Sequence, residues 1–279
     1  MRSLRTGEAD LATFRYARTD SPFYDVVAKF PGTFARDRFP QIQPHWKLEL
    51  PTKAEELYCK FSSKGRKNLR WQAKKLEEVS GGVKITCFRM PRDLDRMFHD
   101  VEAVARKTYH RGLGVGFVDS AEMRERMQLQ AEKGWLRAYV LNLGDVPAAF
   151  WIGTMCGRKF FSDFLGYDDR WGKFSPGTFL MTKILEQFCA EGVEEVDFGL
   201  GDAPYKQRFG NCWWEEASID IFAPTLKGLR INALRTPAIF TEQVVKKTLE
   251  KTQILPRIKR LWRNRAMKVV QHDSTDSVQ

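Results

Sequence analysis

Hydrophobic residues recur every three or four positions in several segments of the first half of the chain. In residues 63–79 the apolar positions have helical spacing and basic residues occupy the opposite face; they are Leu69, Ala73, Leu76 and Val79. Residues 94–105 carry a second stripe, made of Leu94, Met97, Phe98, Val101, Val104 and Ala105. These patterns predict amphipathic helices, and residues 121–133 predict another. Residues 83–88, after Gly81 and Gly82, alternate as a strand does.

Strand periodicity dominates the next part of the chain. Apolar and aromatic runs cover residues 136–143, 148–155 and 159–167, with turn residues at Gly144 and at Gly157 between them. Three such runs joined by tight turns predict an antiparallel meander.

A helix and a further strand follow the meander. Ser175 and Pro176 supply a helix N-cap and a proline at the first helical position, and Gly192 ends the pattern. The buried face of this helix consists of Phe179, Leu180, Ile184, Leu185, Phe188 and Cys189. Residues 193–198 form a strand that must lie parallel to its neighbour, because a helical crossover precedes it.

These patterns predict an α/β (α+β) fold with a mixed, mostly antiparallel sheet flanked by helices, and four segments along the chain. Residues 1–51 form an irregular N-terminal arm with one or two short strands, and residues 52–224 form the main domain. Residues 225–270 are a basic helical segment around Pro237 and Pro256, and residues 271–279 are a disordered tail.

Composition narrows the class of protein. A chain of 279 residues that is 43% hydrophobic can bury a large core, so we expect a globular protein. Five cysteines form no CxxC pair, which favours a reducing cytoplasm. No segment contains the roughly 18 consecutive apolar residues that a membrane span requires. The four histidines lack ligand spacing, and we expect no metal.

The net charge of +11 is concentrated in residues 60–75 and 227–268. For the first of these segments a solvated helix face is the commoner meaning, and an acidic glycan or a membrane surface is equally compatible. Nucleic acid would be contacted by the basic residues Arg66, Lys67, Arg70, Lys74 and Lys75. For the C-terminal segment, packing on the main domain and peripheral contact with an anionic inner membrane surface are equally supported.

The helix start at Ser175, Pro176, Gly177 and Thr178 is the first candidate ligand site. Free N–H groups and the positive end of the helix dipole suit a phosphate, and Gly177 allows a close approach to the backbone. The commoner alternative for such a sequence is an ordinary capped helix.

Residues 196–206 are the second candidate. Asp197, Asp202, Tyr205 and Lys206 follow the end of a predicted strand, which is where α/β sheets tend to place ligands. The alternative is a polar exit from the strand in which Asp202 caps a turn.

Two stretches of the sequence carry a family resemblance. The stretch SPGTFLMTKILEQFCAEGVEEVDFGLGDAPYKQRFG, which begins at Ser175, resembles the signature of FemAB/CelD-like acyltransferases in the GNAT superfamily, in which an SPG-type helix start precedes a strand and a Tyr-Lys pair. The stretch SSKGRKNLRWQAKKLEE, which begins at Ser62, is similar to the basic helix ahead of the GNAT-like domain. The resemblance covers about residues 51–222. It departs from the family in the spacing of Arg170, Gly172 and Gly177, and in the shortness of the arm before Pro51.

The resemblance implies a splayed GNAT-like sheet and an acyl-CoA co-substrate, acetyl-CoA above all. Pantetheine would lie between strands 159–167 and 193–198, and the donor would contact Tyr167, Ser175, Pro176, Gly177 and Thr178. An amine or hydroxyl would attack the thioester directly. The candidate base is Asp163, the candidate acid is Tyr205, and Lys206 is a substrate or phosphate contact. The alternative for Asp163 is a solvent-facing position between Phe161 and Phe164.

The acceptor implied by the resemblance is a small molecule or glycan, such as an amino sugar or another precursor of a cell-surface or extracellular polysaccharide. With an acyl-CoA donor, the basic helix from Arg66 to Lys75 is expected to be dispensable for donor binding. The second possibility is a FemAB-like aminoacyltransferase that uses aminoacyl-tRNA, and the third is a non-catalytic membrane-associated binding protein. We expect a cytoplasmic protein.

Overall fold

The computed structural model describes residues 2–29, 32–108, 111 and 116–251. Residues 112–115 of the glycine-rich segment, Pro256 and the predicted disordered tail lie outside these described residues. The chain divides into two compact units. One contains the residues up to Trp46 together with the chain from Leu200 to the end of the described C-terminal helix, and the other contains Lys47–Gly199.

The Lys47–Gly199 unit is built on strands in the order β7-β6-β5-β4-β3. Its strands are β3 (Val83–Phe88), β4 (Leu136–Leu143), β5 (Val146–Cys156), β6 (Lys159–Tyr167) and β7 (Glu195–Leu200). Neighbours from β3 to β6 are antiparallel, whereas β7 pairs in parallel with β6. The predicted meander and the parallel return of the last strand are both present, although β7 begins two residues later than its sequence pattern does.

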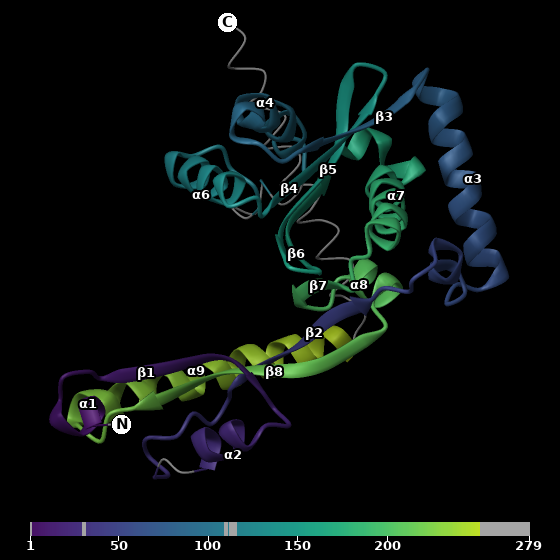
Figure 1. Ribbon diagram of the computed structural model, residues 1–279. Helices are drawn as coiled ribbons and strands as arrows, with labels where there is room; N and C mark the ends of the chain where they lie inside the picture. Colours follow the sequence, from purple (N-terminus) through teal and green to yellow (C-terminus); the bar gives the residue numbers. More distant parts are fainter. Residues whose placement is uncertain (1, 30–31, 109–110, 112–115, 252–279) are drawn as a thin grey trace, which may run out of the picture. The chain divides into compact units, whose positions relative to one another are not determined.

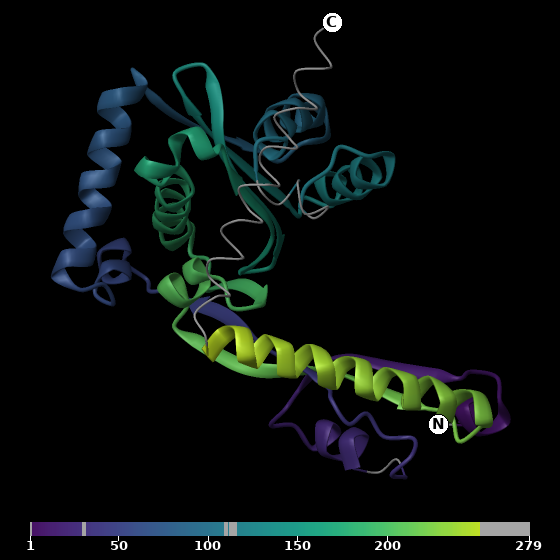
Figure 2. The ribbon, with the colours of Figure 1, turned by 180° about the vertical axis from the view of Figure 1, so that it is seen from behind.

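Helices cover both faces of this sheet (Figure 1). On one face lie α4 (Leu94–Ala105) and α6 (Ala121–Glu132), whose apolar residues share a buried cluster with β4 and β5. On the other lies α7 (Pro176–Glu191), with α3 (Ser63–Ser80) beside it, as Figure 2 shows from behind. The Phe188 ring of α7 packs against Tyr139, Trp151 and Phe160 of the sheet. The predicted mixed, mostly antiparallel sheet flanked by helices is therefore confirmed.

Among the described residues, short 3-10 helices connect these elements, namely η1 (Ala54–Tyr58), η2 (Pro91–Asp93) and η3 (Asp169–Phe174). The helix η1 is the first element after β2 (Gln41–Glu49). The helix η3 joins β6 directly to α7, so the end of one and the start of the other are tied by a few residues.

The other unit contains strands in the order β1-β8-β2, namely β1 (Leu11–Arg18), β8 (Cys212–Phe222) and β2 (Gln41–Glu49). The last residues of β2, from Lys47 on, belong to the Lys47–Gly199 unit. Its helices are α1 (Arg2–Thr6), α2 (Pro22–Lys29), α8 (Pro204–Phe209) and α9 (Leu226–Lys251). A small apolar cluster includes Leu4, Val27, Ile219 and Ile221. Residues 1–51 are thus more regular than the predicted irregular arm, because β1 is held by antiparallel pairing with the distant β8.

The first half of α9 packs within its own unit. Asn232 is buried and its side chain donates to the backbone carbonyls of Phe34 and Arg36 at 2.8 and 3.1 Å. Arg235 forms ion pairs with Asp37 and Asp220. The sequence left open whether the basic segment packs on the protein or contacts an anionic membrane surface. This part of the segment packs against residues of its own unit. In the described part of the chain, no helix is both long and apolar enough to cross a membrane.

Candidate functional site

The ladder between β6 and β7 is short. Register pairs run from Lys159↔Glu195 to Phe161↔Asp197, whereas β6 continues to Tyr167 and β7 to Leu200. Among the described residues, Ser162 to Gly166 of β6 have no register pair with β7, and we call this stretch the open edge of β6. Backbone N–H and C=O groups along an edge that is not paired with a neighbouring strand can bind an extended ligand.

A β-bulge lies in β6 just past the last pair with β7. On the side of β5, the register changes between Ile152↔Phe164 and Gly153↔Ser162, which leaves Asp163 as the extra residue. Gly153 is required opposite the bulge, because a Cβ there would lie 2.3 Å from the carbonyl oxygen of Phe161. The bulge changes the direction of the β6 side chains at the point where the register pairs with β7 stop.

Asp163, the candidate base, is a half-buried residue on the α6 side of the sheet. Its carboxylate forms an ion pair with Arg126 at 2.7 Å and accepts a hydrogen bond from Thr154 Oγ1 at 2.9 Å. It is therefore neither simply solvent-facing nor unpaired. The role of Asp163 as the base stays a prediction.

The helix α7 begins at an unusual residue. Ser175 has φ 54° and ψ 54°, a left-handed conformation that non-glycine residues rarely adopt. Its hydroxyl makes no capping bond and instead accepts a hydrogen bond from Gln72 Nε2 of α3 at 3.0 Å. The predicted N-cap residue is at its expected position, but its side chain is used to join two helices.

Donor groups are left free at this helix start. Pro176 has no N–H, and the N–H of Phe179 donates to the carbonyl of Ser175 at 3.0 Å. For the N–H groups of Gly177 and Thr178, no acceptor is recorded among the described residues. Two backbone donors at the positive end of α7 fit a phosphate or pyrophosphate group.

Tyr167 connects the open edge of β6 to the start of α7. It is the last residue of β6, and its ring lies against Gly177, where an added Cβ would be 3.3 Å from Tyr167 Cδ1. The side chain is 37% exposed, so a ligand at the helix start can still reach the ring. The structure thus brings together Tyr167, Ser175, Pro176, Gly177 and Thr178, which the sequence proposed for donor binding.

Asp168 is a residue at this site that the sequence did not single out. Its side chain is 1% exposed, bonds to Arg170 at 2.6 Å and lies 3.4 Å from Lys107. Burial alone would raise the pKa of Asp168, but hydrogen bonds from Arg170 and the charge of Lys107 more than offset this, so the pKa lies below its usual value. The carboxylate also accepts from the backbone N–H of Arg170, which shapes the turn into η3.

A groove of about 790 Å³ lies between η1, α3 and α7. Its walls include Arg66, Leu69, Arg70 and Ala73 of α3 together with Thr178, Phe179, Thr182 and Lys183 of α7. The sequence showed the basic face of α3 but could not show that it faces α7. No periodic signal within either helix identifies its partner.

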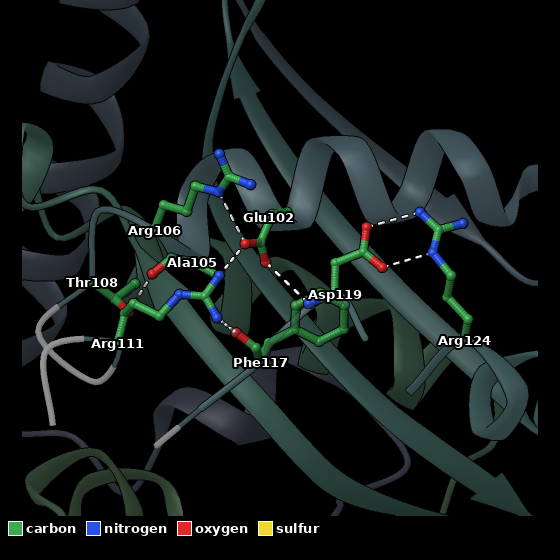
Figure 3. Close-up of polar contacts among 8 residues, drawn as sticks. All are labelled: Glu102, Ala105, Arg106, Thr108, Arg111, Phe117, Asp119 and Arg124. Atoms are coloured by element: carbon green, nitrogen blue, oxygen red, sulfur yellow. Dashed lines mark hydrogen bonds and ion pairs between the residues drawn. The ribbon is translucent and has the colours of Figure 1, made fainter. Parts of the chain in front are cut away.

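A second network of charges surrounds Glu102 at the end of α4 (Figure 3). Glu102 is buried and accepts from Arg106, from Arg111 and, at 3.3 Å, from the backbone N–H of Asp119. Arg111 also donates to the carbonyl of Phe117. These bonds hold Arg111 and the start of α6 to α4, which is a packing role.

Tyr205 and Lys206 belong to the unit that contains β8. Asp163 and the start of α7 belong to the Lys47–Gly199 unit. Lys206 is 7% exposed and its ammonium donates to the carbonyl of Leu200 at 2.5 Å. Their proposed roles as acid and as substrate contact therefore stay predictions.

The geometry of the Lys47–Gly199 unit defines a class of protein. An antiparallel meander, a bulged strand that has only a short register with its parallel neighbour, and a following helix that begins with free N–H groups are the features expected of a GNAT-type acyltransferase. The family model described as an acetyltransferase (GNAT) domain matches residues 63–207, and the chain belongs to this family. It is accordingly a GNAT-type acyltransferase.

Two solved structures with TM-scores above 0.5 share this fold. The C-terminal domain of a putative lysylphosphatidylglycerol synthetase from Agrobacterium fabrum is similar with a TM-score of 0.53 and 11% identity, over 81% of this chain and 72% of that chain. A conserved protein of unknown function from Bacteroides thetaiotaomicron has a TM-score of 0.51 and 10% identity, over 79% and 72%. FemX has a TM-score of 0.47 and 11% identity, over 64% and 61%. Comparison with curated proteins gives no significant match.

Proposed function

We propose that the protein transfers an acyl group, acetyl above all, from acyl-CoA to an amine or hydroxyl acceptor. One observation carries the proposal. The ring of Tyr167, the residue that follows the open edge of β6, lies against Gly177 at the start of α7. A site for an extended thioester arm and a site for its pyrophosphate are therefore adjacent, as a CoA donor requires.

Different residues of the chain would bind the donor and carry out the acid–base chemistry. The N–H groups of Gly177 and Thr178 would bind the pyrophosphate, and N–H groups on the open edge of β6 would donate to the thioester carbonyl oxygen. CoA would supply the activated thioester. Asp163 and Tyr205 are proposed as base and acid, and Lys206 as a substrate contact.

The acceptor belongs to the same proposal. The family resemblance supports a small-molecule or glycan acceptor, in particular a precursor of a cell-surface or extracellular polysaccharide. The proposed setting is the cytoplasm, with peripheral contact of the basic C-terminal segment with anionic membrane. A non-catalytic binding protein would bind acyl-CoA without turnover, so release of free thiol distinguishes it.

A direct test combines binding and turnover. Isothermal titration calorimetry should show saturable binding of acetyl-CoA or a longer acyl-CoA, and thiol release should rise when amino sugars are added. If the purified protein binds no CoA thioester and releases no thiol with any acceptor, the proposed function is wrong.

An aminoacyl-tRNA donor is the second candidate, supported by one surface feature. Trp71 is 53% exposed on α3 and shares a shallow hollow with Lys64, Lys67 and Asn68. An exposed aromatic ring among cations is suited to stack on a nucleic-acid base. Salt-dependent, saturable tRNA binding that Trp71→Ala abolishes, without any CoA binding, would favour this candidate over the first.

A further inference from the structure

The groove between η1, α3 and α7 lies beside the proposed donor site. Thr178 belongs to both, because its N–H is free at the helix start and the residue also lines the groove. The hydrogen bond from Gln72 to Ser175 fixes α3 against the same helix start. A ligand whose pyrophosphate binds at the start of α7 can therefore extend into the groove without leaving the surface.

One cation in the groove is available to a ligand. The guanidinium of Arg70 is exposed and makes no recorded hydrogen bond or ion pair within the described part of the chain. By contrast, Arg66 donates to the carbonyl of Phe61 at 2.6 Å, and Lys183 forms an ion pair with Glu186 at 3.1 Å. Burial and the hydrogen bond to Glu186 raise the pKa of the Tyr58 phenol, and the positive charge of Arg70 partly offsets this rise. An anion entering the groove would meet Arg70 as its first unused partner.

The acidic residues of the groove are partly neutralised. Glu186 accepts a hydrogen bond from Tyr58 and pairs with Lys183, which leaves Glu55 as the other carboxylate of the lining. The lining thus combines one unpaired guanidinium with an apolar wall made of Leu69, Ala73 and Phe179. This combination suits a ligand that has a flat apolar part and a separate phosphate.

We propose that the groove binds the nucleotide end of CoA and that Arg70 contacts its 3′-phosphate. The proposal rests on the proposed function. Thr178 and Glu186 lie about 12 Å apart along the helix at 1.5 Å per residue, which is enough for a nucleoside. The volume of about 790 Å³ is in the range of small-molecule sites. The basic helix α3 is then part of donor binding, which replaces the expectation from sequence that it is dispensable.

Calorimetric titration with CoA and with dephospho-CoA, which lacks the 3′-phosphate, tests the assignment. The parent protein should bind CoA about tenfold more tightly than it binds dephospho-CoA, because the 3′-phosphate forms a charge-assisted hydrogen bond with Arg70. Arg70→Gln should weaken CoA binding by about tenfold and leave dephospho-CoA within about twofold. Arg70→Lys keeps the charge and should retain part of the preference for CoA.

Lys74→Gln is the matched control. Lys74 is on the same helix, its side chain is 77% exposed, and it does not line the groove. It should change neither affinity by more than about twofold, because isolated surface charges contribute little. Melting temperatures of all variants establish that the fold is kept.

The possible failures are separable. If CoA binds to the parent and Arg70→Gln changes nothing, or weakens both ligands equally, the groove assignment is wrong while the proposed function stands. If the parent binds neither CoA nor dephospho-CoA, both are wrong. An equal loss in Lys74→Gln and Arg70→Gln would indicate general charge attraction and would also overturn the assignment.

Discussion

At the first turn of α7, the missing side chain of Gly177 leaves room for the ring of Tyr167. Gly177→Asp adds bulk next to the ring, and its carboxylate repels a phosphate at the free N–H groups. An acidic residue in a first helical turn stabilises the helix, so the fold should be kept. We predict a loss of CoA affinity of at least about tenfold, or 1.4 kcal/mol, by calorimetry.

The matched control is Gly177→Ala, which adds a Cβ without charge. Because that Cβ would lie 3.3 Å from Tyr167 Cδ1, the ring must move by only a few tenths of an ångström. The affinity should stay within about threefold, or 0.7 kcal/mol. An aspartate variant that is folded and binds CoA normally would remove this helix start from the site.

Also at the residue scale, Asp168→Asn removes a buried charge that holds Arg170 and Lys107. Both partners are exposed, so the expected loss in the free energy of unfolding at pH 7 is reduced to about 1–3 kcal/mol. The folded-state pKa of Asp168 is lowered, so its contribution is complete above the usual value of 3.8 and is lost as the pH falls through the folded-state pKa. Urea unfolding between pH 7 and acid pH should therefore show a shallower decline for the variant. Parallel curves for the two proteins would contradict this role.

At the scale of elements, the bulge in β6 depends on a glycine in β5. Gly153→Ala would place a Cβ 2.3 Å from the carbonyl oxygen of Phe161 and equally close to the Phe160 ring. Strands β5 and β6 must then separate, so we predict a loss of about 1–3 kcal/mol in unfolding free energy and weaker CoA binding. Gly172→Ala is the control, because its Cβ meets only an ordinary contact at 3.8 Å, and should change stability by less than about 0.5 kcal/mol. Urea denaturation compares them, and equal stabilities would show that the bulge tolerates a side chain.

At the scale of the whole molecule, the basic C-terminal segment has two parts with different expected roles. Up to Thr241, α9 is anchored by Asn232 and Arg235. The sequence beyond Lys251 continues with basic residues among Ile, Leu and Trp. We predict that the full chain sediments with anionic vesicles at low salt, and that a chain ending at Lys251 does so less. Equal sedimentation of the two chains, or no effect of added salt, would contradict the membrane role.

Much of the fold could be predicted from the sequence because helical spacing, strand alternation and turn residues are local features of the chain. Apolar spacing predicted the helices of residues 63–79, 94–105 and 121–133, and tight turns predicted the meander. The two ends of α7 were predictable because Pro176 and Gly192 have strong backbone preferences for the first helical position and for the residue after the helix. The alternation in β8, where Ala217, Ile219 and Ile221 are buried, was available too and was missed.

Only the tertiary structure decided which of these elements meet and how the site is completed. The left-handed Ser175 is bound by Gln72, which is 103 positions away, and the bulge at Asp163 depends on the register with β5. The groove requires α3 to face α7, and the sequence of one helix does not specify its neighbour. Periodicity along a chain determines which face of an element is buried, whereas ligand contacts depend on packing between distant segments.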